Sequence, residues 1–203
     1  MEPLVNPGRF RFVQRPELER IAANLIDPLD DVARFGFLTS WRRSEILGLT
    51  WEAVDRRAGE IRLRTSKNGR PRVLPLAGEL SDLIERRWAK REYVGPQGTA
   101  AVSGYVFHRR GKPVKDFREA WRQAASTAKV PGVLFHDLRR SGIRDMVLAG
   151  VPQSVAMAIS GHHRYAIASP DDMRDAIEKT RAYRESLESE SNVKEFPSEG
   201  TGR

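Results

Sequence analysis

The sequence predicts a mainly helical domain that carries one small β-sheet. Along most of the chain, apolar residues recur every three to four positions, which is the spacing of an amphipathic helix. Between Glu60 and Leu76 the pattern changes to an alternation of apolar and polar residues, which indicates strands. A length of 203 residues, 39% of them hydrophobic, suffices for one domain with a good core or two small ones.

The first helices are predicted from proline positions and apolar spacing. Pro16 stands in the first turn of a helix that begins at Arg15, and Pro28 interrupts that helix. A second helix is expected at about 29–38 and a third at about 43–48, followed by a short helical turn at 50–54.

A β-hairpin is predicted next. The stretches 60–64 and 72–76 alternate, and Asn68-Gly69 lies between them. Asn-Gly accepts the positive φ angles of a tight hairpin turn. Lys67 therefore lies at the expected tip of the hairpin.

Helices are again expected in the second half of the chain, and their ends are marked by glycine, serine and proline. Gly150 ends a helix that begins at His136, and Ser169-Pro170 begins a last one. The intervening elements are predicted from spacing alone: a helix at 78–91, a loop at 95–104, a strand at 105–107, a turn at 109–113, and helices at 116–128 and 152–159.

Composition points to a polyanionic partner. The net charge is +8, and the excess lies before Ser186, because the tail from there carries two basic and four acidic residues. No apolar run is long enough for a transmembrane helix, the first residues do not resemble a signal peptide, and there is no cysteine. We expect no membrane association, and the lack of cysteine is compatible with a reducing cytoplasm.

Arg42 and Lys67 are the first two candidate site residues. Arg42 stands where a loop enters a helix, so its guanidinium could bind phosphate beside helix-terminal amides, and Glu45 could pair with Arg42 or Arg43. Lys67 could deliver a proton from the hairpin tip, amid Arg62, Arg64, Arg70 and Arg72. For each residue alone, an exposed surface side chain is the plain alternative.

His136 and Arg139 are three positions apart on one helix and share a face, so both can serve the same phosphate. A polar helix N-terminus is the alternative reading of this pair. The segment 161–165 contributes His162 and Tyr165. With only four histidines, no cysteine and no His pair at helical spacing, we expect no metal site.

Together these side chains supply what metal-free attack on a phosphodiester needs. The cations neutralise the phosphate, the acid and base groups move protons, and the phenol is a nucleophile. The six candidates are Arg42, Lys67, His136, Arg139, His162 and Tyr165.

The order and spacing of these blocks resemble the tyrosine recombinase (phage integrase) family. The segment 39–51 is similar to its first arginine box, His136 and Arg139 to its His-x-x-Arg box, and 149–162 to its Gly-His box. The resemblance covers about 16–185 and implies the catalytic-domain fold of that family.

The resemblance also implies a function, which is site-specific DNA cleavage and rejoining through a 3′-phosphotyrosine. Tyr165 would be the nucleophile, Arg42 and Arg139 would stabilise the transition state, and Lys67 would protonate the leaving oxygen. His136 would assist proton transfer at Tyr165, and His162 would donate to a non-bridging oxygen. The implied partner is double-stranded DNA, bound by a homotetramer, and no cofactor is implied.

Two departures from the family pattern leave alternatives open. About 15 residues precede the first matched helix, so we expect an extension at 1–15, a catalytic domain at 16–185, a disordered tail at 186–203 and no N-terminal core-binding domain. His162 and Tyr165 are three positions apart, where the family usually has about nine. The chain could therefore be a degenerate or truncated remnant that binds DNA without cleaving it. A third reading, in which the motif matches are due to chance, is a general basic nucleic-acid-binding module.

Overall fold

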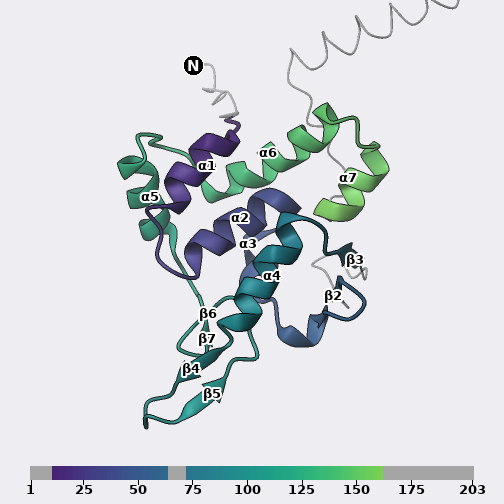
Figure 1. Cartoon of the computed structure of the whole chain (residues 1–203). Helices are drawn as coiled ribbons and strands as arrows, with labels where there is room; N and C mark the ends of the chain where they lie inside the picture. The colour runs from purple at the N-terminus through teal and green to yellow at the C-terminus, as the bar shows by residue number, and fades with distance from the viewer. Residues whose placement is uncertain (1–10, 64–71, 162–203) are drawn as a thin grey trace, which may run out of the picture. The chain divides into compact units, whose positions relative to one another are not determined.

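A computed structural model describes residues 11–63 and 72–161. The prediction of a mainly helical fold is confirmed. The helices of these residues are α1 (Arg15–Ala22), α2 (Leu29–Thr39), α3 (Arg43–Leu47), the 3-10 turn η1 (Trp51–Ala53), α4 (Glu79–Ala89), α5 (Arg118–Thr127), α6 (Phe135–Leu148) and α7 (Gln153–Ser160) (Figure 1). The helix predicted from Ser169 onward and the predicted tail lie outside the described residues.

The predicted hairpin strands pair as expected. Strand β2 (Glu60–Leu63) is antiparallel to β3 (Arg72–Pro75), with Ile61 opposite Leu74. A short strand, β1 (Val54–Asp55), pairs with the other edge of β2. The sequence did not predict it, because two residues are too few to show an alternating pattern. The predicted Asn68-Gly69 turn and Lys67 lie outside the described residues.

The prediction was wrong in part between residues 92 and 113. Strand β5 (Ala100–Val102) lies within the loop expected at 95–104 and pairs with β4 (Glu92–Val94). Val94 and Val102 are exposed, so no buried face marks this ribbon in the sequence. At 105–107 the expected strand is reduced to an isolated bridge between Tyr105 and Thr50, and the next two residues are buried in the core. The expected turn lies between two short strands, β6 (His108–Arg109) and β7 (Lys112–Pro113).

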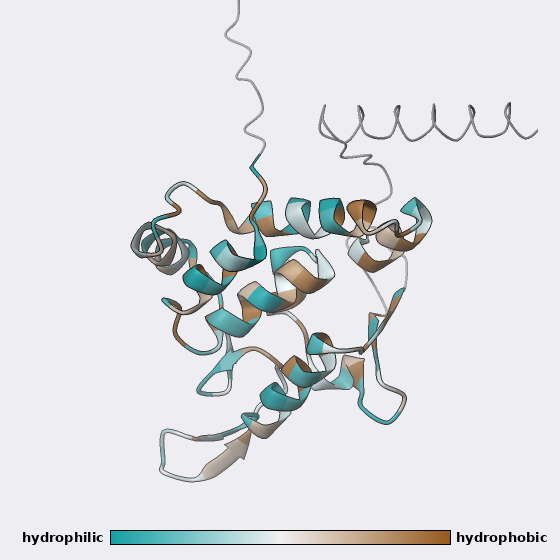
Figure 2. Ribbon diagram, turned by 45° about the horizontal axis from the view of Figure 1, so that its top comes forward, coloured by the Kyte–Doolittle hydropathy of each residue, from teal (hydrophilic) through white to brown (hydrophobic). Residues whose placement is uncertain are grey.

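The core lies between the helices, with α2 packed against α1, α4 and α6. Figure 2 shows that the helices carry apolar and polar positions side by side, as amphipathic helices do. Gly142 lets α6 approach α2 closely, because a Cβ there would lie 2.4 Å from the carbonyl oxygen of Phe37. The largest fully buried apolar side chains are those of Leu18, Ile21, Leu29, Phe35, Trp41, Ile46, Leu49, Ile61, Leu83, Ile84 and Phe107.

The end of α7 lies beside two other elements that matter for the site. Helix α7 packs against α6 and also contacts strand β3.

Within the described residues, no helix combines the length and the apolar character needed to span a membrane.

Candidate functional site

Arg42 occupies the N-cap position of α3, as the sequence predicted. Glu45, one turn into the helix, accepts hydrogen bonds from the Arg42 backbone N–H and from Arg42 Nη1, each at 3.1 Å. The carboxylate thus closes the first turn of α3 and holds the guanidinium at the same time. Of the two pairings expected for Glu45, the one with Arg42 forms, whereas Arg43 lies 3.8 Å from Asp116.

A second arginine reaches the same carboxylate from strand β3. Arg72 Nη2 donates to Glu45 Oε2 at 2.8 Å, and the Arg72 guanidinium carbon lies 4.4 Å from the centre of the Trp41 ring. Burial alone would raise the pKa of Glu45, but the hydrogen bonds from Arg72 and Arg42 outweigh it and lower that pKa. Glu45 is therefore ionised across the physiological pH range.

Three side chains donate to the last carbonyl groups around the end of α7. Trp41 Nε1 donates to Ile159 O at 2.9 Å, Arg139 Nη1 to Ser160 O at 2.8 Å, and Arg42 Nη2 to Gly161 O at 3.4 Å. Carbonyl groups at the end of a helix receive no hydrogen bond from the helix backbone, and these three side chains supply the missing donors. The carboxyl end of α7 is thereby fixed to the segment at 41–42 and to α6.

Gly161 has a steric reason to be glycine. It ends α7 in the left-handed conformation with φ +69°, which favours glycine. A Cβ at this position would lie 1.6 Å from Arg72 Nη1. The backbone of Gly161 therefore lies directly against the Arg72 guanidinium.

Arg139 is buried, with 3% of its surface exposed. Its Nη1 also donates to the carbonyl oxygen of Ser40, the left-handed residue that ends α2. Burial lowers the pKa of Arg139 to about 10, and the positive charges of Arg42 and Arg72 act in the same direction, against the opposing effect of Glu45. Arg139 remains charged at neutral pH, but in a position where positive charge is already in excess.

His136 lies one turn before Arg139 on α6 and lines a cavity of about 550 Å³ with it. Partial burial lowers the pKa of His136, as do the nearby charges of Arg140, Arg139 and Arg42, while Asp137 opposes the shift. His136 is therefore mainly neutral at pH 7. The floor of the cavity is apolar and includes Phe117, Trp121 and Phe135.

The structure thus brings together three of the six predicted site residues, namely Arg42, His136 and Arg139. The other three, Lys67, His162 and Tyr165, lie outside the described residues. The sequence placed Arg72 among several hairpin arginines without distinguishing it. On the neighbouring strand, Arg62 has a side chain that is 59% exposed, whereas that of Arg72 is 10% exposed. The strand register separates the two, because Arg72 is opposite Leu63 and Arg62 is one residue away, so they lie on opposite faces of the hairpin. Arg72 lies on the buried face, where Trp41 and Glu45 contact its guanidinium.

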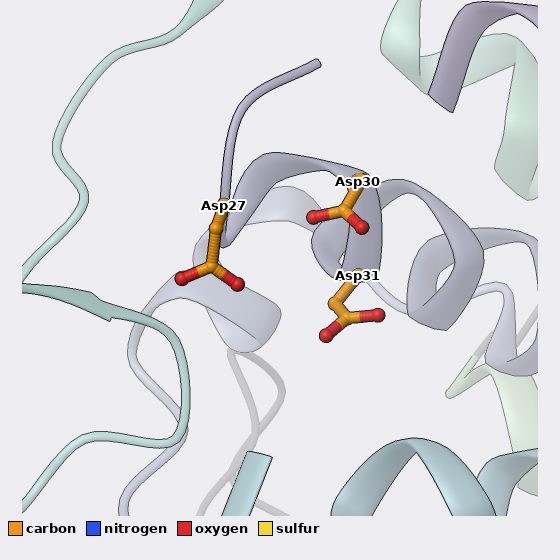
Figure 3. Close-up of side chains that lie close together, drawn as sticks. All are labelled: Asp27, Asp30 and Asp31. Atoms are coloured by element: carbon orange, nitrogen blue, oxygen red, sulfur yellow. The ribbon is translucent and has the colours of Figure 1, made fainter. Parts of the chain in front are cut away.

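A second group of charges, formed by Asp27, Asp30 and Asp31, has the donor set of a cation site (Figure 3). Cationic side chains already occupy it. The ion pairs join Arg34 to Asp30 at 3.0 Å, Arg86 to Asp31 at 2.7 Å, Arg87 to Asp31 at 3.6 Å and Lys90 to Asp27 at 2.9 Å. We assign it as an ion-pair network between the start of α2 and the end of α4.

The fold and the arginine cluster define a mainly helical domain with a concentration of positive charge at the end of α7, and comparison with known proteins identifies its family. The model of the phage integrase family matches residues 12–169. The chain therefore belongs to the phage integrase family, as the sequence blocks predicted.

Relatives and solved structures agree with this assignment. The integrase of Salmonella phage P22 is 28% identical over 178 residues, which cover 82% of this chain and 46% of that protein. XerA recombinase has the same fold, with a TM-score of 0.62 at 18% identity, covering 84% of this chain and 65% of that one. The Tn1549 transposon integrase, solved in complex with circular intermediate DNA, has a TM-score of 0.60 at 19% identity, covering 87% and 66%. The chain spans about half the length, or less, of the curated relatives it matches.

Proposed function

We propose that this chain is the catalytic domain of a site-specific DNA recombinase that cleaves and rejoins strands through a 3′-phosphotyrosine. The observation that carries the proposal is the convergence of Arg42 and Arg139 on the end of α7. They donate to the carbonyls of Gly161 and Ser160, and the next residue in the chain is His162. The two arginines thus border the start of the segment that holds His162 and Tyr165.

The chemistry follows from the residue types. The Tyr165 phenol oxygen attacks phosphorus, the bond from phosphorus to the 5′-oxygen breaks, and Arg42 and Arg139 neutralise the charge that develops. The phenol proton passes to His136, whose lowered pKa keeps it in the neutral form that accepts a proton. Lys67 gives a proton to the leaving 5′-oxygen, and His162 donates to a non-bridging oxygen.

The reverse step joins a new strand. A 5′-hydroxyl of a partner strand attacks the phosphotyrosine and releases Tyr165, so the energy of the phosphodiester bond is kept and ATP is not required. The partner is double-stranded DNA, in keeping with the net charge of +8 and with the DNA complex of the Tn1549 integrase. We expect a homotetramer to assemble on the DNA, in the cytoplasm at the nucleoid.

A non-cleaving DNA-binding protein of the same family is the second candidate. The observation that favours it is the three-position separation of His162 and Tyr165. Three residues span at most about 10 Å, which limits how far the tyrosine can move relative to the histidine. Such a protein would keep the arginine cluster and lose the covalent step.

The test is a suicide substrate, a duplex nicked next to the cleavage position so that the short 5′-hydroxyl fragment is lost and the covalent intermediate persists. A pool of candidate attachment sequences replaces the unknown target site. The wild type is compared with Tyr165→Phe, and with Tyr183→Phe as a matched control. We expect a denaturation-resistant adduct in the wild type and in Tyr183→Phe but not in Tyr165→Phe.

DNA binding without an adduct in the wild type would favour the non-cleaving alternative. In that case, six residues inserted between His163 and Arg164 would lengthen the connection. Recovery of the adduct in the lengthened protein would show that the short connection is what prevents cleavage.

A further inference from the structure

The Arg72 guanidinium has buried donors that meet no acceptor in the part of the chain that the structure describes. Its side chain is 10% exposed, and its Nε and Nη1 atoms are shielded from solvent without a hydrogen-bond partner among the described residues. A buried donor without a partner is costly, and such groups in folded proteins usually have a specific reason.

Two contacts hold Arg72 in this position. The guanidinium carbon lies over the Trp41 ring, 4.4 Å from its centre, and Glu45 accepts from Nη2 at 2.8 Å. Nη1 lies against Gly161, where a Cβ would be 1.6 Å away. Nη1 therefore lies at the end of α7, beside the carboxylate that holds Nη2.

The charges at this place do not balance among the described residues. Arg42, Arg72 and Arg139 lie close together, and Glu45 is the acidic residue paired with the first two. Arg42 and Arg72 help burial to lower the pKa of Arg139, which is a sign of mutual repulsion. A bound anion would relieve this repulsion and accept the free hydrogen bonds.

We propose that Arg72 is a third phosphate-binding arginine of the site, donating from Nε or Nη1 to a non-bridging oxygen of the phosphodiester. The inference rests on the proposed function for the identity of the anion. Guanidinium groups bind phosphate oxygens strongly through charge-assisted hydrogen bonds in the plane of the group, and Nε and Nη1 of Arg72 have no other acceptor among the described residues.

The experiment measures binding of inorganic phosphate by the full chain, without DNA. The thermal midpoint of unfolding is recorded in phosphate and in chloride at equal ionic strength, and the phosphate-dependent rise is converted to an apparent Kd. The variants are Arg72→Gln and the matched control Arg62→Gln, which removes the same charge from an exposed position on the neighbouring strand. We expect Arg72→Gln to weaken phosphate binding about tenfold and Arg62→Gln to leave it nearly unchanged.

A purely structural role for Arg72 predicts a different result. The midpoint in chloride would then fall in Arg72→Gln, but the additional rise caused by phosphate would equal that of the wild type. An unchanged phosphate effect would overturn the proposal whatever happens to the midpoint in chloride.

A second measurement covers the case in which Arg72→Gln does not fold. In the wild type, the Nε–H resonance of Arg72 is identified in an NMR spectrum by its absence from Arg72→Lys, which keeps the charge but has no Nε–H. We expect phosphate to shift this resonance with the same apparent Kd. No shift at saturating phosphate would contradict the proposal.

The phosphate test fails or succeeds separately from the proposed function. If the suicide substrate yields no adduct but phosphate binding depends on Arg72, the cleavage proposal fails and the anion site stands. If an adduct forms and phosphate binding does not depend on Arg72, the reverse holds. If both proposals are supported, the slope of log K for DNA binding against log salt should be smaller in Arg72→Gln than in the wild type. The difference should correspond to about one phosphate contact.

Discussion

Two clusters of charged residues in this protein are built from the same kinds of side chain but differ in how far positive and negative charges compensate each other. In the cluster of Asp27, Asp30 and Asp31, each carboxylate pairs with a cation from α2 or from the end of α4. In the cluster around Glu45, a single carboxylate holds Arg42 and Arg72, and Arg139 lies close to both. The first joins two helices, and the second leaves positive charge in excess among the described residues.

The difference separates charges that serve folding from charges that serve binding. Removing one partner of a buried, compensated pair leaves an isolated charge, so such clusters are sensitive to single changes. Crowded like charges oppose folding, and their cost is recovered when a ligand of opposite charge binds. Changes in the first cluster should therefore mainly lower stability, and changes in the second should mainly weaken anion binding.

The largest expected effect is on stability, from Arg87→Met. Arg87 is 1% exposed and lies 3.6 Å from Asp31, which is equally buried. Removing the guanidinium leaves buried negative charge with fewer partners, and we expect a loss of about 3–5 kcal/mol in the free energy of unfolding. Urea denaturation measures it.

Arg118→Met is the control for this change. Arg118 pairs with Asp116 at 2.8 Å, but its side chain is 78% exposed. Because water screens such a pair, the denaturation midpoint should hardly move. Equal losses in the two variants would mean that burial does not distinguish the ion pairs of this protein.

The second effect is on catalysis, from Arg139→Gln. Under the proposed function this change should lower the rate of adduct formation on the suicide substrate by about 100- to 1000-fold, the usual cost of losing one group that stabilises developing charge. The unfolding free energy should fall less than in Arg87→Met, because loss of the Arg139 charge also relieves repulsion with Arg42 and Arg72. A loss of stability as large as that of Arg87→Met would instead make Arg139 a structural cation.

The sequence was sufficient for elements whose residues carry a local signal. Pro16 marked the first turn of α1, and alternation predicted the pairing of β2 with β3, whereas α1 ends at Ala22 rather than at Pro28, which precedes α2. It was insufficient where tertiary contacts decide. Val94 and Val102 lie on a two-stranded ribbon with exposed side chains, so no periodic burial could reveal it.

The same limit applies to the site. Arg42 and Arg139 were predicted because each belongs to a recognisable block, and the structure brings both to the end of α7. Arg72 was not distinguished from Arg62, because the pairing register that puts them on opposite faces of the hairpin was not fixed by the sequence. The partners of Arg72 on the buried face, Trp41 and Glu45, come from a distant part of the chain.

The third effect tests how the site is positioned, through Gly142→Ala. A Cβ at this residue of α6 would meet Ser40 Oγ at 2.3 Å and Phe37 O at 2.4 Å, so α6 must move away from α2. Alanine favours a helix over glycine by about 1 kcal/mol, yet we expect a net loss of about 1–3 kcal/mol from the clash. Phosphate binding should weaken as well, because Ser40 also accepts a hydrogen bond from Arg139.

The control for this change is Gly104→Ala, where a Cβ would meet no atom within 4 Å. Its unfolding free energy and its phosphate affinity should match the wild type. A Gly142→Ala protein as stable as the wild type would show that the two helices can separate without cost.

The smallest effect is the acid sensitivity of the two clusters, which should fall in separate pH ranges. The pKa of His136 is lowered from 6.5 by partial burial and by Arg140 and Arg139, so the unfolded chain binds this proton more readily and stability declines as pH falls below about 6.5. Burial alone would raise the pKa of Asp27, but hydrogen bonds from Lys90 and Arg87 outweigh it and lower the pKa from 3.8, so that contribution is lost only in stronger acid.

Urea denaturation at a series of pH values separates the two contributions. Because His136 is partly exposed, its contribution should stay below about 1 kcal/mol. His136→Gln should remove the decline that begins near pH 6.5 and keep the one below pH 4, whereas Asp27→Asn should do the reverse. If His136→Gln leaves the upper part of the profile unchanged, His136 is not held in its neutral form by the arginine cluster, and its role as the proton acceptor for Tyr165 loses its electrostatic support.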